Sequence, residues 1–107
     1  MRGRGAARAG SRLLVVHANQ TDSQAVRPPR VGLVVSKGVG GAVVRNRVKR
    51  RLRAQTQSLI PAVPIGVDLV VRAQQPSAAA SSAALGHELE RLLGQVLERL
   101  STGSGRP

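Results

Sequence analysis

The alternation of apolar and polar residues predicts three short β-strands. Leu13–Ala18 is a β-prone aliphatic run, Arg30–Ser36 alternates apolar side chains, and Val67–Ala73 does the same. Residues 19–29, between the first two strands, are rich in Asn, Gln, Asp, Ser and Pro, which predicts a loop. In the second strand, the side chains predicted to share one face are Val31, Leu33 and Val35.

Two longer stretches carry the helical period instead. In Ala42–Leu59 the apolar side chains return on one narrow side, and Pro61 prevents the helix from continuing. In Leu85–Leu100 leucine and valine recur at the spacing of an amphipathic helix, with Ser81 or Ser82 as a candidate N-cap. Both stretches are therefore predicted to be helices that bury one side.

The order strand, strand, helix, strand, helix predicts an α+β fold. We expect a small two-layer sandwich in which the helices pack on a mixed β-sheet. A chain of 107 residues suits one domain, which we assign to residues 13–100. Residues 1–12 are mostly Arg, Gly and Ala without an apolar period, so they are predicted to form a disordered basic arm. Residues 101–107 are predicted to form a disordered tail.

Charge is distributed unevenly along the chain. The net charge is +12, and thirteen of the 17 Lys and Arg residues precede Ala54, against one acid, Asp22. Such an excess repels itself unless a polyanion neutralises it, so a polyanionic partner is predicted. No hydrophobic run approaches the roughly 20 residues that cross a bilayer, which makes the cytoplasm the expected location. Phe, Tyr and Trp are absent, which predicts a thin aliphatic core.

The densest charge lies in RNRVKRRLR, residues 45–53, inside the first predicted helix. Its cations are Arg45, Arg47, Lys49, Arg50, Arg51 and Arg53. Like charges stand four residues apart and repel each other, so only an external anion makes the arrangement favourable. Helices that bind an anionic membrane surface usually present a broad face with aromatic side chains, which this helix lacks. Nucleic acid is therefore the predicted partner, and a membrane is not.

The absence of aromatic side chains also restricts how nucleic acid can be recognised. Proteins that read single strands by sequence stack bases on aromatic rings. This chain is expected to contact phosphates and shape through arginine forks, which suits folded RNA. Asn46 could reach a 2′-hydroxyl or a base edge, although an incidental polar residue or a helix cap would look the same. Lys37–Gly41 is either a glycine-rich loop that approaches a phosphate or a plain tight turn.

Side chains suited to catalysis are few. The chain has five Asp and Glu residues, two His and no Cys, at spacings that bring no three metal ligands together. We therefore predict no catalytic residue, no intrinsic metal site and no disulfide.

The stretch RVGLVVSKGVGGAVVRNRVKRRLR, Arg30–Arg53, resembles the signature of the bacterial ribonuclease P protein subunit family. That signature is a strand, a lysine-glycine turn and then Ala-Val-x-Arg-Asn-x-x-Lys-Arg-x-x-Arg. The matching residues here are Lys37, Gly40, Ala42, Val43, Arg45, Asn46, Lys49, Arg50 and Arg53. The last strand and the last helix also follow the family's order, so the resemblance spans Leu13 to Leu100.

The resemblance implies a ribonucleoprotein endonuclease that removes the 5′ leader from precursor tRNA. In this family the catalytic RNA subunit, with magnesium, performs the hydrolysis, and the protein binds that RNA and aids leader binding. The implied partners are the RNA subunit and precursor tRNA, with no obligatory protein partner. The residues implied to bind RNA are Lys37, Arg45, Asn46, Arg47, Lys49, Arg50, Arg51 and Arg53.

The resemblance also implies a leader cleft on the sheet face, beside a short N-terminal helix. We expect this sequence to start after the position of that helix. That cleft normally bears aromatic side chains, and the candidates here are Leu14, Val16 and Arg30. A structural RNA-binding protein of ribosomal type is the alternative function, and an autonomous hydrolase is a third. Stimulation of leader cleavage by the catalytic RNA separates the three.

Overall fold

The computed structural model describes residues 5–20 and 29–105, and side chains as far as residue 101. The strands are β1 (Ala6–Gly10), β2 (Leu14–Gln20), β3 (Arg30–Val34) and β4 (Val67–Ala73). The α-helices are α1 (Ala42–Leu59) and α2 (Ser82–Gly105). Short 3-10 helices are η1 (Lys37–Val39), η2 (Ile60–Ala62) and η3 (Gln75–Ala79).

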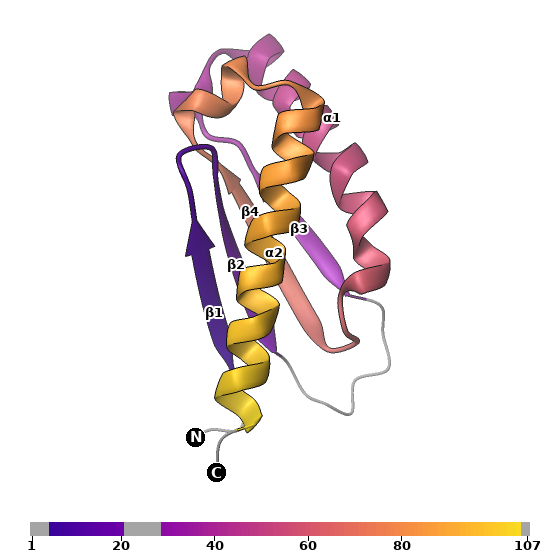
Figure 1. The fold of residues 1–107 in the computed structure, drawn as a ribbon. Coiled ribbons are helices and arrows are strands. Elements are labelled where there is room, and N and C mark those ends of the chain that lie inside the picture. Colours follow the sequence, from indigo (N-terminus) through magenta and orange to yellow (C-terminus); the bar gives the residue numbers. More distant parts are fainter. Residues whose placement is uncertain (1–4, 21–28, 106–107) are drawn as a thin grey trace.

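The four described strands form one mixed sheet in the order β1-β2-β4-β3. β1 with β2 and β2 with β4 are antiparallel, whereas β3 runs parallel to β4 at the edge of the sheet. Both helices lie on the same face, α2 across β1 and β2, and α1 beside it towards β3 (Figure 1). This arrangement confirms the predicted α+β sandwich of helices on a mixed sheet.

The core lies between the helices and the sheet. Every second residue of a strand points to the helices, so Leu14 and Val16 of β2 and Val71 of β4 are completely buried there. In β3 the predicted inward residues, Val31 and Leu33, pack against this core. Because its side chains are aliphatic throughout, the core has none of the large ring burials that usually dominate domain stability.

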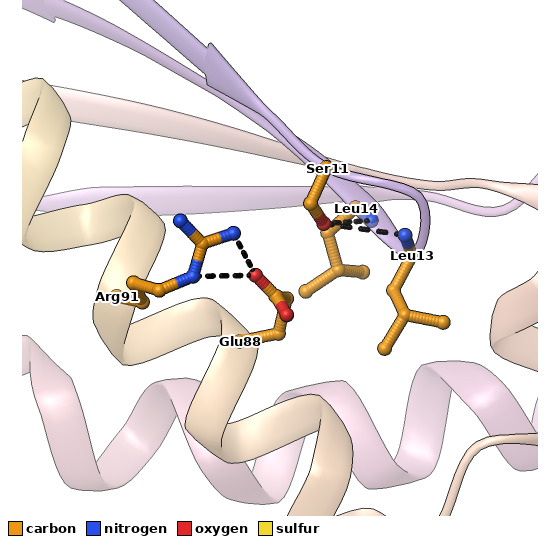
Figure 2. Close-up of polar contacts among 5 residues, drawn as sticks. All are labelled: Ser11, Leu13, Leu14, Glu88 and Arg91. Atoms are coloured by element: carbon orange, nitrogen blue, oxygen red, sulfur yellow. Dashed lines mark hydrogen bonds and ion pairs between the residues drawn. The ribbon is translucent and has the colours of Figure 1, made fainter.

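The prediction of a disordered arm at residues 1–12 is wrong for Ala6–Gly10, which form β1. Its backbone pairs with β2, and Ala9 is 3% exposed beneath the helix layer. The Ser11 hydroxyl accepts hydrogen bonds from the backbone N–H groups of Leu13 and Leu14, which closes the β1–β2 hairpin (Figure 2). Backbone hydrogen bonding needs no large side chain, so the Arg-Gly-Ala composition concealed this strand.

Other boundaries moved less. The predicted tail at residues 101–107 is wrong as far as Gly105, because α2 continues to that residue, past the buried Leu100. Of the predicted loop at residues 19–29, Asn19 and Gln20 belong to β2 and residues 21–28 lie outside the described residues. Residues 1–4 and 106–107 lie outside them as well. The first predicted helix and the last predicted strand have the bounds observed for α1 and β4.

Two glycines of α2 give a matched test of how α1 and α2 pack. An alanine Cβ at Gly94 meets no heavy atom within 4 Å, whereas one at Gly86 would lie 2.2 Å from Gln55 Oε1. We expect Gly94→Ala to raise the free energy of unfolding by about 1 kcal/mol, the ordinary helix-propensity gain. Gly86→Ala should gain less, because Gln55 must move and lose its 3.0 Å hydrogen bond to Ser82. Urea denaturation measures both, and equal gains would contradict the close approach at Gly86.

Candidate nucleic-acid interface

The basic helix α1 is held by a narrow apolar seam. Val48 and Leu52 are completely buried, and Thr56 is 7% exposed with its hydroxyl donating to the Arg53 carbonyl. Val44 and Leu59 pack against the same core from the ends of the helix. The stripe predicted from the sequence is thus the surface by which α1 packs on the core.

On the side that faces α2, α1 is tied by polar contacts. Arg51 Nη1 donates to the Ala80 carbonyl oxygen at 2.7 Å, and Gln55 Nε2 donates to Ser82 Oγ. Arg51 therefore holds the segment that leads into α2. Its predicted role in RNA binding stays a prediction, but its guanidinium already has a partner within the protein.

The other cations of α1 are arranged differently. Arg45, Lys49 and Arg53 follow one another four residues apart, so they form a row along the helix. Lys49 and Arg53 line a groove between this side of α1 and β3. Asn46 and Arg50 are exposed next to that row. We refer to Arg45, Asn46, Lys49, Arg50 and Arg53 as the basic face.

Carboxylates lie away from the basic face within the described part of the chain. Asp68 is on β4, and Glu88, Glu90 and Glu98 are on α2. Glu88 Oε1 accepts a hydrogen bond from Arg91 Nε at 2.8 Å within its own helix (Figure 2). No ion pair involving an α1 cation is present among the described residues, so no carboxylate in that part of the chain offsets the mutual repulsion of these cations.

The start of α1 adds to the positive potential. Gly41 is the N-cap and offers no side chain to the free backbone N–H groups, and no acidic residue stands in the first turn. Gly40 has φ 158°, and a Cβ there would lie 2.8 Å from Val44 Cγ1, so this turn requires glycine. Lys37 is exposed in η1, just before it. The glycines thus shape a tight turn that also leaves the helix amides open to an anion.

The predicted leader cleft is wrong in two of its three residues. Leu14 and Val16 are 0% exposed because they point to the helix layer, so neither can line an open cleft. Arg30 is exposed on the opposite face of the sheet, where its backbone N–H donates to Asp68 Oδ1 at 3.4 Å. Successive residues of a strand face opposite sides of the sheet, and the prediction assigned Leu14 and Val16 to the wrong side.

The sheet face away from the helices, which we call the open face, has no helix over it among the described residues (Figure 1). Strand register places Arg8 opposite His17 and His17 opposite Val70, with Arg72 and Arg30 one row to either side. Sequence reasoning did not select Arg8, His17 or Arg72. His17 and Arg72 could have been assigned to the open face, because they alternate with buried residues of β2 and β4. Arg8 could be assigned to this face only once β1 was recognised as a strand.

The described residues offer no centre for metal or membrane chemistry. Within residues 5–20 and 29–101, no three His, Asp or Glu side chains gather where they could share a metal ion. None of the helices in that part of the chain is both long and apolar enough to cross a membrane. What the described residues do provide is cationic surfaces and exposed backbone amides, which are groups that bind anions.

Comparison with known proteins gives a consistent picture. The family model described as Ribonuclease P matches residues 3–97. The Ribonuclease P protein component of a Nocardioides species is 50% identical over 89 residues, covering 83% of this chain and 76% of that protein. The corresponding protein of Beutenbergia cavernae is 58% identical over 77 residues, covering 72% of this chain and 63% of its own length.

Solved structures agree on the fold. The RNase P protein of Staphylococcus aureus superimposes with a TM-score of 0.69 at 27% identity, over 83% of this chain and 79% of that one. The RNase P protein of Thermotoga maritima superimposes with a TM-score of 0.72 over 85% of this chain and 84% of its own. Its sequence is 22% identical, so that likeness concerns the fold alone.

Proposed function

This chain belongs to the ribonuclease P protein family, and on that premise we propose that it binds the catalytic RNA of ribonuclease P and assists removal of the 5′ leader from precursor tRNA. Membership makes the chain a protein component of an endoribonuclease. The proposal adds what the protein does within it: α1 docks on the RNA subunit, in the cytoplasm, without an obligatory protein partner.

The uncompensated charge of α1 is the observation that supports docking. The basic face presents Lys and Arg side chains with no carboxylate partner described, beside a helix start whose amides are uncapped. RNA phosphates would relieve the repulsion among these cations and bind bidentately to the arginines. They would also give partners to the buried Nε atoms of Arg45 and Arg47, which have none among the described residues, if the guanidinium groups turned outward.

The open face is the proposed contact for the precursor leader, in place of Leu14 and Val16. Arg8, Arg30 and Arg72 are exposed there around the half-buried imidazole of His17. A sheet face with several cations suits a single strand, whose phosphates it can follow without reading base identity. Leader binding on this face is expected to depend on salt and only weakly on sequence.

Hydrolysis is assigned to the RNA subunit and its magnesium ions in this proposal. The described carboxylates and imidazoles do not converge, so within that part of the chain they do not form a magnesium site. The protein would contribute by neutralising phosphates whose mutual repulsion magnesium ions otherwise screen, so that the RNA subunit and its substrate assemble at a lower magnesium concentration.

The test is leader cleavage of a precursor tRNA by the cognate RNA subunit at low magnesium, with and without this protein. We expect cleavage to be stimulated, and the protein alone to cleave nothing. Tight RNA binding without stimulation would favour the alternative of a structural RNA-binding protein. Metal-dependent cleavage by the protein alone would contradict the assignment of catalysis to RNA.

A further inference from the structure

The groove between α1 and β3 combines two kinds of surface in one place. Its volume is about 320 Å³, at the lower end of the range for small-molecule sites. Val31, Leu33 and Ile60 give it an apolar floor, and Lys49 and Arg53 stand along its α1 side. Gln57, which is exposed, lies on the rim. If α1 bound RNA through charge alone, an apolar surface beside its cations would serve no purpose in that binding.

The groove also borders an edge strand of the sheet. β3 is the last strand in the order of the sheet, so one backbone edge has no partner strand among the described residues. Edge strands present free N–H and C=O groups that bond to whatever lies alongside. Apolar floor, backbone edge and adjacent cations together match the three parts of one nucleotide: a base face, a base edge and a phosphate.

We propose that this groove receives the base of an unpaired nucleotide of the catalytic RNA subunit, whose flanking phosphates bind Lys49 and Arg53. The inference rests on the docking of α1 proposed above. The RNA subunit, and not the leader, is the occupant because the groove lies on the helix side of the sheet, away from the open face. In this way a chain without aromatic side chains would pack an RNA base against aliphatic side chains.

The test fills the groove without changing its charge. Gln57→Trp places an indole on the rim, and Ser58→Trp places the same bulk at the next exposed position, which does not line the groove. We expect Gln57→Trp to weaken binding of the RNA subunit about tenfold and Ser58→Trp to leave the Kd within about twofold of wild type. Each Kd is measured at one fixed salt concentration.

Chemical probing of the RNA subunit at saturating protein then identifies the base. Reagents that together cover all four unpaired bases should show a nucleotide protected by wild type and by Ser58→Trp, but reactive with Gln57→Trp. Identical protection with both variants would overturn the proposal, as would equal losses of affinity. Failure of the wild-type protein to bind the RNA subunit above an unrelated RNA would instead overturn the proposed function, which separates the two results.

Discussion

Replacing Arg45, Lys49 and Arg53 together by glutamine is expected to lower affinity for the catalytic RNA about 100-fold at 0.15 M salt. Each phosphate contact releases about 0.9 of a counterion, which is worth about fivefold in affinity at that salt concentration. The slope of log K against log salt should therefore become shallower by about 2 to 3. Glutamine is a good helix former, so α1 itself is preserved. Binding titrations at four or five salt concentrations measure both quantities.

The matched control removes three charges elsewhere. Arg12, Arg91 and Arg99 are exposed, and the last two lie on α2, away from the basic face. Their replacement by glutamine changes the net charge equally, but should change the slope by less than about 1, because no phosphate contact is lost. Equal effects of the two triple variants would mean that net charge alone drives binding and that the row on α1 has no particular role.

Elements with strong side-chain signals could be predicted from the sequence. The bounds of α1 followed from the apolar spacing of Val48 and Leu52, together with the glycines before the helix and the prolines after it. β4 followed in the same way from the apolar alternation of Val67, Leu69 and Val71. β1 could not be predicted, because Ala7 and Ala9 bury too little surface to mark a strand and its stability comes from pairing with β2.

The site was predictable in part. The positive charges of α1 can be read directly from the sequence. The hydrogen bond from Arg51 to the Ala80 carbonyl cannot, because it depends on how the fold brings these two distant residues together. For the sheet, Leu14 and Val16 were chosen by position in a resembling family, although alternation predicts that such aliphatic residues face the core. The groove beside β3 could not be foreseen, because it depends on how far α1 stands from the sheet edge.

Leu52→Ala is expected to cost about 2–5 kcal/mol of the free energy of unfolding, because Leu52 is completely buried at the centre of the α1 seam. Domains of this size have about 5–15 kcal/mol in total, and this core lacks aromatic burials, so the variant should be close to unfolding when free. Urea denaturation measures the loss. Leu97→Ala is the control, since Leu97 is only half-buried on α2 and should cost less.

The same variant tests how far RNA stabilises the fold. A ligand that binds only the folded protein adds about 2.7 kcal/mol when its concentration is 100 times its Kd, which would offset much of the loss from Leu52→Ala. If the RNA subunit binds α1 as proposed, it neutralises the cations that repel one another along this helix, so the variant's thermal midpoint should rise on adding the RNA subunit. If Leu52→Ala costs no more than Leu97→Ala, α1 is not anchored by this seam. If the RNA subunit leaves the midpoint unchanged, folding is not coupled to charge neutralisation on α1.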